Sequence, residues 1–173
     1  MIITDIGQHS VEEINLGKAG ADYGWPYREG TFVFDANANR EMVYPLPPND
    51  SRYTEPVIQF DHDEGNAVSG GYVYAGNKVS QLNGKYIFGD ISNGNLFYSE
   101  ESEIIEGQQA ALYRLNVEIN EKYKSLQSIN PNHRVDLRFG IDGSGEIYIF
   151  TKSNGKIYKV VNCKIAKLPK LQD

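Results

Sequence analysis

The sequence has a single cysteine, little positive charge and no long apolar run, and each absence narrows what the protein can be. One cysteine, Cys163, excludes an internal disulfide and a zinc site built from cysteines. No run of 18 apolar residues is present, so we expect no membrane insertion. The 17 lysines and arginines stand against 23 aspartates and glutamates, a formal net charge of −6. Nucleic acid, whose phosphates need a basic face, is therefore not an expected partner.

The composition favours one β-rich domain. Twelve tyrosines, seventeen glycines and a 40% share of hydrophobic residues suit strands and turns, and 173 residues are enough for a core. Short apolar or alternating runs, bounded by turn-forming residues, predict the strands. They lie at Glu13–Leu16, Val57–Phe60, Val68–Tyr74, Lys85–Phe88, Asn95–Ser99 and Ala111–Ile119.

A repeated pattern in the second half of the chain predicts the architecture. Gly84–Phe88 and Ser92–Phe97 recur as Gly145–Ile149 and Ser153–Tyr158, at a constant offset of 61 residues. Two hairpins of one design, each turning on Ser-Asn-Gly, are typical of successive propeller blades. A blade of four antiparallel strands takes about 40–50 residues. We therefore expect an all-β chain of about three blades, a part of a propeller rather than a closed disc.

Three stretches lack a clear strand pattern. The prolines and Asn/Asp clusters of residues 31–56 predict a long irregular loop, which in a propeller would lie on the rim. Residues 123–132 form a weak segment that we expect to be a loop. Residues 162–173 become basic and form a tail, which is either a linker or a closing strand.

The N-terminal stretch Asp5–Gly30 concentrates acids, glycines and aromatic residues. We expect a strand at Glu13–Leu16, a corner at Gly17–Gly20 and a buried aromatic plug at Tyr23–Tyr27. A turn that brings carboxylates and carbonyl oxygens together suits a hard cation. The alternative is a packed loop whose acids are solvated.

Several motifs, in order along nearly the whole chain, resemble one known family. They are D-I-G-Q, E-E-I-N and D-Y-G-W-P within Asp5–Pro26, F-D-H at Phe60–His62, V-S-G-G-Y-V-Y at Val68–Tyr74, G-K-Y-I-F-G-D at Gly84–Asp90, D-L-R-F-G at Asp136–Gly140 and Y-K-V at Tyr158–Val160. The chain is similar to the glucose/sorbosone dehydrogenase family, six-bladed β-propellers whose active members carry pyrroloquinoline quinone (PQQ) and calcium. The resemblance implies that residues 1–161 are C-terminal blades of such a propeller. It also implies a periplasmic or extracellular location, although Met1–Thr4 is too short for a signal peptide.

The resemblance implies two calcium positions. A structural calcium would be held by the carboxylate of Glu13 and the backbone carbonyl of Tyr23, and calcium takes six to eight such oxygen ligands. The alternative is a site with too few charged ligands to fill. A second calcium, which touches the quinone, would take the backbone carbonyls of Gly7 and Gln8.

The quinone is a tricarboxylate, and arginine is the best partner for its carboxylates. Arg134 is what remains of the family's R-x-R, and Ser92, or within one residue Asn93, stands where the family has lysine. The histidine that takes the sugar's proton belongs to an earlier blade, outside these residues. Two functions stay open. One is the C-terminal portion of a PQQ-dependent sugar dehydrogenase, not catalytic on its own; the other is a non-catalytic, calcium-stabilised module that binds a glycan or a protein, as in the Hedgehog-interacting-protein-like propellers.

Two further expectations concern His62 and assembly. His62 lies among acids that would raise its pKa, the alternative being a solvated loop histidine. An arc of about three blades exposes the faces of its end sheets, so we expect either a homodimer or cover by missing N-terminal blades. Strands such as Tyr86–Phe88 or Ile147–Phe150 would supply the dimer interface. The competing outcome is a monomer capped by the 31–56 loop and the tail.

Overall fold

The computed structural model describes residues 1–119, 122–129 and 134–166. Every strand pair is antiparallel, and the described residues contain short 3₁₀ turns but no α-helix. The all-β, antiparallel prediction is confirmed. The strands are β1 (Ile2–Asp5), β2 (Val11–Leu16), β3 (Arg28–Glu29), β4 (Phe32–Phe34), β5 (Val43–Pro45), β6 (Ile58–Asp61), β7 (Val68–Val73), β8 (Lys85–Asp90), β9 (Leu96–Glu100), β10 (Tyr113–Ile119), β11 (Lys122–Lys124), β12 (Leu137–Ile141), β13 (Ile147–Thr151), β14 (Lys156–Lys159) and β15 (Cys163–Ala166).

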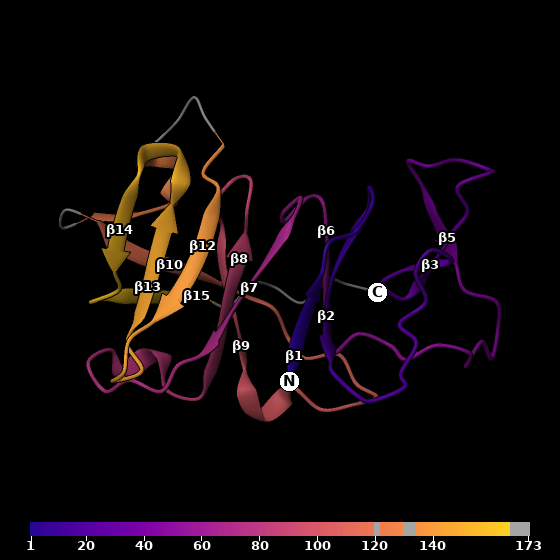
Figure 1. The fold of residues 1–173 in the computed structure, drawn as a ribbon, viewed down its shortest axis with the longest axis horizontal. Coiled ribbons are helices and arrows are strands. Elements are labelled where there is room, and N and C mark those ends of the chain that lie inside the picture. The colour runs from indigo at the N-terminus through magenta and orange to yellow at the C-terminus, as the bar shows by residue number, and fades with distance from the viewer. Residues whose placement is uncertain (120–121, 130–133, 167–173) are drawn as a thin grey trace.

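These strands form four sheets. The sheets β1-β2-β6, β3-β4-β5 and β12-β13-β14 have three strands each, whereas β7-β8-β9-β10 is extended by β11 and β15, which both pair with β10. The three larger sheets stand side by side, and the small β3–β5 sheet lies beyond β2 and β6 (Figure 1). The series β7–β10 is the four-stranded sheet expected of a blade. Its two neighbours differ from that expectation, because each has three strands among the described residues.

Two apolar cores hold the three larger sheets together. One lies between β12–β14 and the β7–β10 sheet and contains Ile87 and Leu137, both almost fully buried. The other lies between the β7–β10 sheet and β1-β2-β6. Its centre is a cluster of three rings, Phe60, Phe88 and Phe97, whose centroids are 5.2–6.4 Å apart. The middle sheet is therefore covered by apolar contacts on both faces.

Strand β8 shows the consequence for assembly. Its side chains alternate between the two cores, since successive residues of a strand point to opposite faces. Tyr86 and Phe88 are 2% and 0% exposed, so the expectation that Tyr86–Phe88 supplies an interface to another chain is wrong. The other strand of that expectation, Ile147–Phe150, belongs to the end sheet, where Tyr148 and Phe150 remain half-buried.

The repeated hairpins occupy equivalent positions in adjacent sheets. Phe88 pairs with Phe97 across β8 and β9, and the residues 61 positions later, Ile149 and Tyr158, pair across β13 and β14. Both Ser-Asn-Gly turns end on a glycine with positive φ, 74° at Gly94 and 68° at Gly155. An L side chain rarely adopts this conformation, so the glycine fixes the turn. The repeat predicted from the sequence is therefore a repeat of structure.

Three segments expected to be irregular contain strands. Residues 31–56 contribute β4 and β5, because the apolar Phe32–Phe34 run finds partners in β3 and β5. Lys122–Lys124 pairs with β10 as β11. In the tail, Cys163–Ala166 forms β15 on the edge of β10, as the closing-strand alternative anticipated, and residues 167–173 lie outside the described part.

Candidate metal centre

Two adjacent acids of β2, Glu12 and Glu13, point to opposite faces of its sheet. The Glu12 carboxylate is fully buried and accepts the backbone N–H of Val68 (2.7 Å). It also lies 3.1 Å from Nε2 of His62, whose side chain is 28% exposed. Burial raises the pKa of Glu12, and the hydrogen bonds from Val68 and His62 oppose the shift. His62 is therefore the partner of a buried acid rather than a solvated loop residue.

Glu13 faces the turn between β3 and β4. Its carboxylate accepts hydrogen bonds from the N–H of Gly30 and from Nδ2 of Asn15 (3.1 Å). Burial raises the pKa of Glu13, and so do the charges of Asp5, its cross-strand neighbour, and Glu29. The Oδ1 atom of Asn15 is buried and has no hydrogen-bond partner among the described residues. An unpaired amide oxygen beside a buried carboxylate, with further acids around it, matches the oxygen-rich environment that calcium prefers.

Tyr23 lies at the end of the same strand. Its hydroxyl donates to the carbonyl of Leu16 (2.8 Å) and accepts the N–H of Lys18 (3.0 Å), which holds the corner against β2. No described contact joins Tyr23 to Glu13. Within the part of the chain that the structure describes, no three His, Cys, Asp or Glu side chains are placed to share a metal ion. A cation here would depend on amide and carbonyl oxygens as well as on Glu13.

The loop between β1 and β2 carries Gly7 and Gln8. The backbone N–H groups of the two residues after Gln8 donate to the Glu29 carboxylate (2.8 and 3.2 Å). A Cβ on Gly7 would lie 1.9 Å from the carbonyl oxygen of Val11, so only glycine fits this position. The loop is therefore held by Glu29 and by close backbone packing, both of which are contacts within the protein.

Arg134 lies at the same end of the sheets as this loop. The next residue, Val135, donates its N–H to the carbonyl of Ser92 (2.8 Å), so the structure brings together the two positions expected to anchor the quinone. The Arg134 side chain is 59% exposed and is paired with Asp136 (3.0 Å). His133 lies outside the described residues.

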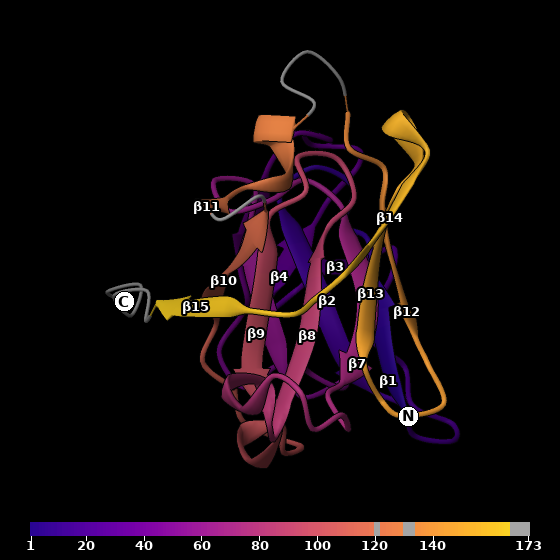
Figure 2. The same ribbon diagram turned by 90° about the vertical axis from the view of Figure 1, so that its left-hand side faces the viewer.

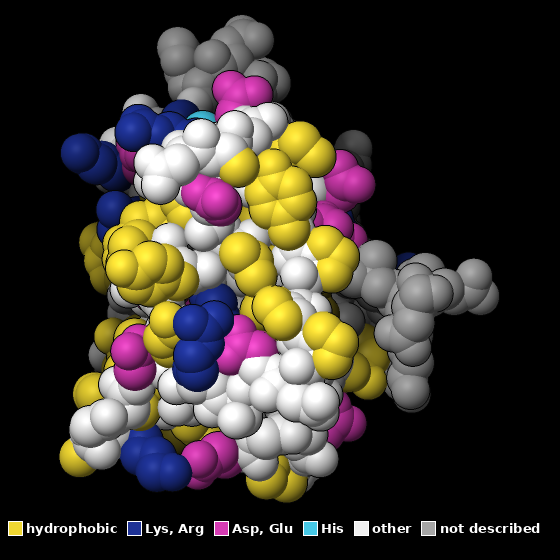
Figure 3. Space-filling model, turned by 90° about the vertical axis from the view of Figure 1, so that its right-hand side faces the viewer, with side chains coloured by type: hydrophobic (Ala, Val, Ile, Leu, Met, Phe, Trp, Pro, Cys, Tyr) yellow, Lys and Arg dark blue, Asp and Glu magenta, His cyan; other side chains and the backbone are white. Residues whose placement is uncertain are grey.

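The aromatic corner is not the buried plug expected from the sequence. Trp25 stacks on Phe34, with ring centroids 5.5 Å apart, yet Trp25 stays 54% exposed and Tyr27 is 65% exposed. The reason is that the small β3–β5 sheet offers Trp25 one ring rather than a closed core. Figure 3 faces the side of the molecule that carries this sheet and shows hydrophobic side chains at the surface among acidic and basic ones.

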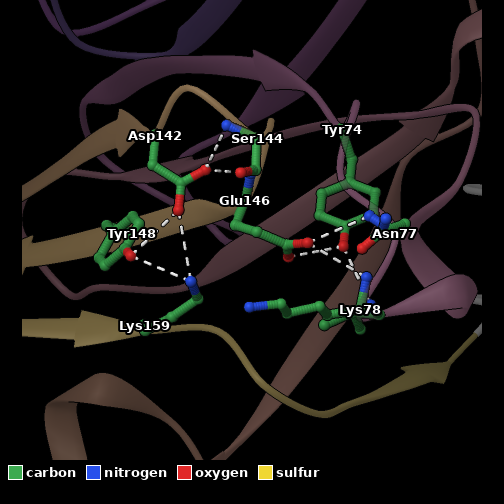
Figure 4. A network of polar contacts seen from close by, with 9 residues as sticks. Tyr74, Asn77, Lys78, Asp142, Ser144, Glu146, Tyr148 and Lys159 are labelled. Carbon is green, nitrogen blue, oxygen red and sulfur yellow. Dashed lines mark hydrogen bonds and ion pairs between the residues drawn. The ribbon is translucent and has the colours of Figure 1, made fainter.

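Another buried acid, Glu146, joins two sheets. It accepts hydrogen bonds from the hydroxyl of Tyr74 (2.8 Å) and from the N–H groups of Asn77 and Lys78 (both 3.1 Å), across from β13 to the loop after β7 (Figure 4). Burial raises the pKa of Glu146, but these donors outweigh the effect and leave it lowered. Its acceptor sites are filled from within the protein, so we assign it a structural role.

Sequence reasoning identified Glu13 but missed Asn15, Asp5 and Glu29. For Asn15 the signal was present, because residues i and i+2 of a strand share a face and E-I-N therefore puts Glu13 and Asn15 side by side. Asp5 and Glu29 come close to Glu13 through contacts between different segments of the chain, and no local sequence pattern predicts these contacts.

Comparison with known proteins gives a family and several relatives. The family model for glucose/sorbosone dehydrogenase matches residues 1–159. HIPL2 protein of Arabidopsis thaliana is 25% identical over 186 residues, covering 95% of this chain and 25% of that protein. Hedgehog-interacting protein of Mus musculus is 32% identical over 124 residues, covering 67% of this chain and 17% of that protein. The chain spans about a quarter of these relatives or less, and no solved structure gives a significant match.

Proposed function

Because this chain belongs to the glucose/sorbosone dehydrogenase family, we propose that it is a calcium-stabilised part of a propeller that binds a protein rather than oxidising a sugar. The observation that carries the calcium assignment is the buried Glu13–Asn15 pair. One of its oxygen atoms has no partner, and the nearby charges that act on Glu13 are those of other acids. Such a pair is costly in the absence of a cation.

The residues that would hold the ion are Glu13, through its carboxylate, and Asn15, through Oδ1. The carbonyl of Tyr23, implied by the family resemblance, is the third candidate. When bound, calcium would neutralise the charge that Asp5, Glu13 and Glu29 place in this region. It would thereby fasten the β3–β5 sheet, whose first strand ends at Glu29, to β2.

The residues at the quinone position do not fit PQQ. A tricarboxylate needs several unpaired cations, but Arg134 is already paired with Asp136 and a serine stands at position 92. Buried Glu12 and Asp90 lie at the same end of the sheets and would repel its carboxylates. We derive no catalytic step through this cofactor.

The proposed binding surface is the exposed aromatic corner, which contains Trp25, Tyr27 and Met42, each more than half exposed. Exposed Trp and Tyr side chains are frequent anchors of protein interfaces, since they bury much area with little loss of side-chain entropy. A relative is named for its interaction with Hedgehog, which favours a protein partner for this chain as well. On the family resemblance we place that partner in the periplasm or outside the cell. The described residues contain no helix long and apolar enough to cross a bilayer.

A melting experiment with added ligands tests the proposal. Calcium, but not magnesium, is expected to raise the melting temperature, because an ion that binds only the folded state stabilises it by mass action. The absorbance spectrum of PQQ is expected to stay unchanged when PQQ and calcium are added to the protein. An unchanged melting curve at millimolar calcium would remove the metal from the proposal. Trp25→Ala should weaken capture of a candidate partner and leave the calcium response intact.

The second candidate function is the C-terminal portion of a PQQ-dependent sugar dehydrogenase, which the family match over residues 1–159 favours. It is tested with glucose, PQQ, calcium and a dye acceptor. We expect no turnover from this chain. Dye reduction that depends on both sugar and PQQ would establish the dehydrogenase function and overturn the proposed one.

A further inference from the structure

Strand β1 has one open edge. It pairs with β2 alone among the described residues, and the N–H of Gly17 donates to the carbonyl of Met1 (2.7 Å). Backbone groups of an antiparallel strand point alternately to one edge and the other. If Met1 points towards β2, Ile3 and Asp5 do the same. The N–H and C=O groups of Ile2 and Thr4 then point to the opposite edge, where no described residue pairs with them.

The direction of the strands shows which strand belongs at that edge. β7 and β12, the first strands of their sheets, lie beside each other and run in the same direction, because β12 begins where Leu137 donates its N–H to the carbonyl of Ile91 (3.1 Å), next to the start of β7. β1 also lies beside β7 (Figures 1 and 2) but runs the opposite way, since it ends near the start of β7. β1 therefore holds the second position of its sheet, as β8 and β13 do in theirs.

The sequence also shows that β1 is equivalent to β8. Asp5-Ile6 at the end of β1 repeats Asp90-Ile91 at the end of β8. Asp90 pairs with Val68, the first residue of β7. Its carboxylate accepts the N–H groups of Asn66 and Ala67, the two residues that lead into β7. A carboxylate at this position thus anchors the start of the first strand.

The Asp5 carboxylate has no such donors. Asp5 is exposed, and no hydrogen bond to its carboxylate is found among the described residues. The neighbouring surface of β7 is open as well: Gly70 is exposed, and Tyr72 is 38% exposed. A Cβ on Gly70 would come within 3.2 Å of Oγ1 of Thr4, so β1 and β7 converge here.

We propose that the open edge of β1 binds one extended strand, antiparallel to β1, whose leading N–H groups bind the Asp5 carboxylate. Its sequence is expected to share the pattern of β7 and β12, Val-Ser-Gly-Gly-Tyr and Leu-Arg-Phe-Gly-Ile, which have an apolar first residue, a glycine fourth and an apolar fifth residue. The glycine is required by close approach, since a Cβ on Gly71 would lie 1.7 Å from the carbonyl oxygen of Ile87. Addition of a strand to an exposed edge is an established mode of recognition.

The occupant is a strand of a further propeller segment of this family, not a second copy of this chain. The relatives are four to six times longer than the part that this chain matches, since 1/0.25 is 4 and 1/0.17 is about 6, so they contain sequence that can supply such a strand. If a second copy offered its own β1, the strand Ile-Ile-Thr-Asp would lack the glycine in fourth position and the apolar fifth residue of this pattern.

A grafted strand tests the proposal in calcium-free buffer, so that its outcome is separate from that of the calcium site. Residues 134–146, which are β12 with its lead-in and following turn, are duplicated directly ahead of Met1. In the native hairpin, Leu137 pairs with Thr151, which is the fifth residue counted from Ile147. In the graft, Met1 follows the duplicated segment directly and takes the place of Ile147, and Asp5 is the fifth residue counted from Met1. The duplicated Leu137 is therefore expected to pair with Asp5. The control graft carries Leu137→Asp and Ile141→Asp in the duplicated copy.

The expected result is that hydrogen exchange of the Ile2 and Thr4 amides slows at least tenfold in the graft and not in the control. Asp5→Asn should reverse most of the gain in melting temperature that the graft brings, whereas in the original chain, where it relieves the repulsion of Glu13, it should not lower the melting temperature. Unchanged exchange at Ile2 and Thr4 would overturn the proposal. So would light scattering that shows the original chain as a dimer with these amides already protected.

Discussion

Replacing Glu13 by glutamine is expected to stabilise the calcium-free protein at neutral pH and to abolish its response to calcium. Burial, together with the charges of Asp5 and Glu29, raises the pKa of Glu13 in the folded state. A carboxyl group with a raised folded-state pKa contributes stability that is fully present below its unfolded pKa and is lost as the pH rises through the folded one. As the pH rises, the protein therefore bears a growing cost for ionising the buried Glu13. Glutamine stays neutral and removes that cost.

Glutamine also fits the hydrogen bonds at this position. Its Oε1 keeps the N–H of Gly30, and its Nε2 faces Asn15. If the Asn15 amide turns over, Oδ1, which has no partner in the native protein, accepts from the new amide. After that turn, Nδ2 of Asn15 takes the position that Oδ1 has in the native pair, so the number of buried polar atoms without a partner does not rise and the gain comes from the removed charge.

The two expected effects are of measurable size. Each unit by which the pKa of Glu13 is raised corresponds to about 1.4 kcal/mol, so Glu13→Gln should raise the stability of the calcium-free protein. Calcium at a hundred times its dissociation constant adds about 2.7 kcal/mol to the native protein. For a chain of this size, 1 kcal/mol moves the melting temperature by about 2–4 °C. The variant should therefore melt above the native protein in chelator, while the native protein gains about 5–11 °C in calcium.

Calorimetry at pH 7.5 and pH 5, with chelator and with calcium, measures both effects. The advantage of Glu13→Gln in chelator should shrink at pH 5, where native Glu13 is closer to neutral. Glu12→Gln is the matched control, because Glu12 is the adjacent buried acid on the opposite face of the sheet, and this variant should retain the full calcium response. The reasoning fails if Glu13→Gln keeps the calcium shift, or if it melts below the native protein in chelator.

Three further predictions concern the frame around the site. Phe88→Ala should lower the free energy of unfolding in urea by about 3–5 kcal/mol, and Phe150→Ala, on the half-buried outer face of the end sheet, by less than half of that; equal losses would contradict the assignment of the inner core. Burial raises the pKa of Cys163 to about 11, so a thiol reagent at pH 8 should label it only on unfolding, and rapid labelling of the native protein would contradict its burial. Glu146→Ala should lower the melting temperature by several degrees and accelerate hydrogen exchange in the loop after β7, whereas Glu146→Gln, which keeps one acceptor, should have a smaller effect.

The parts of the fold that could be predicted from the sequence are those that local rules determine. The two Ser-Asn-Gly turns require glycine at positive φ, as found at Gly94 and Gly155, and alternation marked the long strands. Strands β1, β4, β5 and β11 were not predicted, because they have only three or four residues and contain too little periodicity. β5 even ends on Pro45, a residue that argues against a strand. Each of these strands exists because a partner edge is available, and that is information about the fold rather than about the segment.

The residues of the candidate site also divide into those that local sequence rules predict and those that depend on the fold. Glu13 carried a recognisable motif, and Asn15 follows from its spacing in the strand. Trp25 was misjudged, because a large aromatic residue is buried only where the fold supplies enough surface to cover it, and Phe34 supplies one ring. The role of Glu29 depends on a contact between β3 and the loop after β1, about twenty positions apart in the chain, and nothing in either segment announces it.

The two neighbouring acids of β2 show why one face of this strand, and not the other, points to a ligand. Adjacent residues of a strand point to opposite faces, and β2 is buried on both. Each of the two carboxylates therefore needs its own hydrogen-bond or charge partners. The Glu12 carboxylate is hydrogen-bonded to the backbone N–H of Val68 and to the ring of His62. Glu13 has a backbone N–H and an amide, and that amide leaves its own oxygen unpaired. Each carboxylate has two donors, but the charges that act on Glu13 are those of Asp5 and Glu29, and an amide oxygen beside it is unpaired among the described residues, so we expect a cation on that face of the strand.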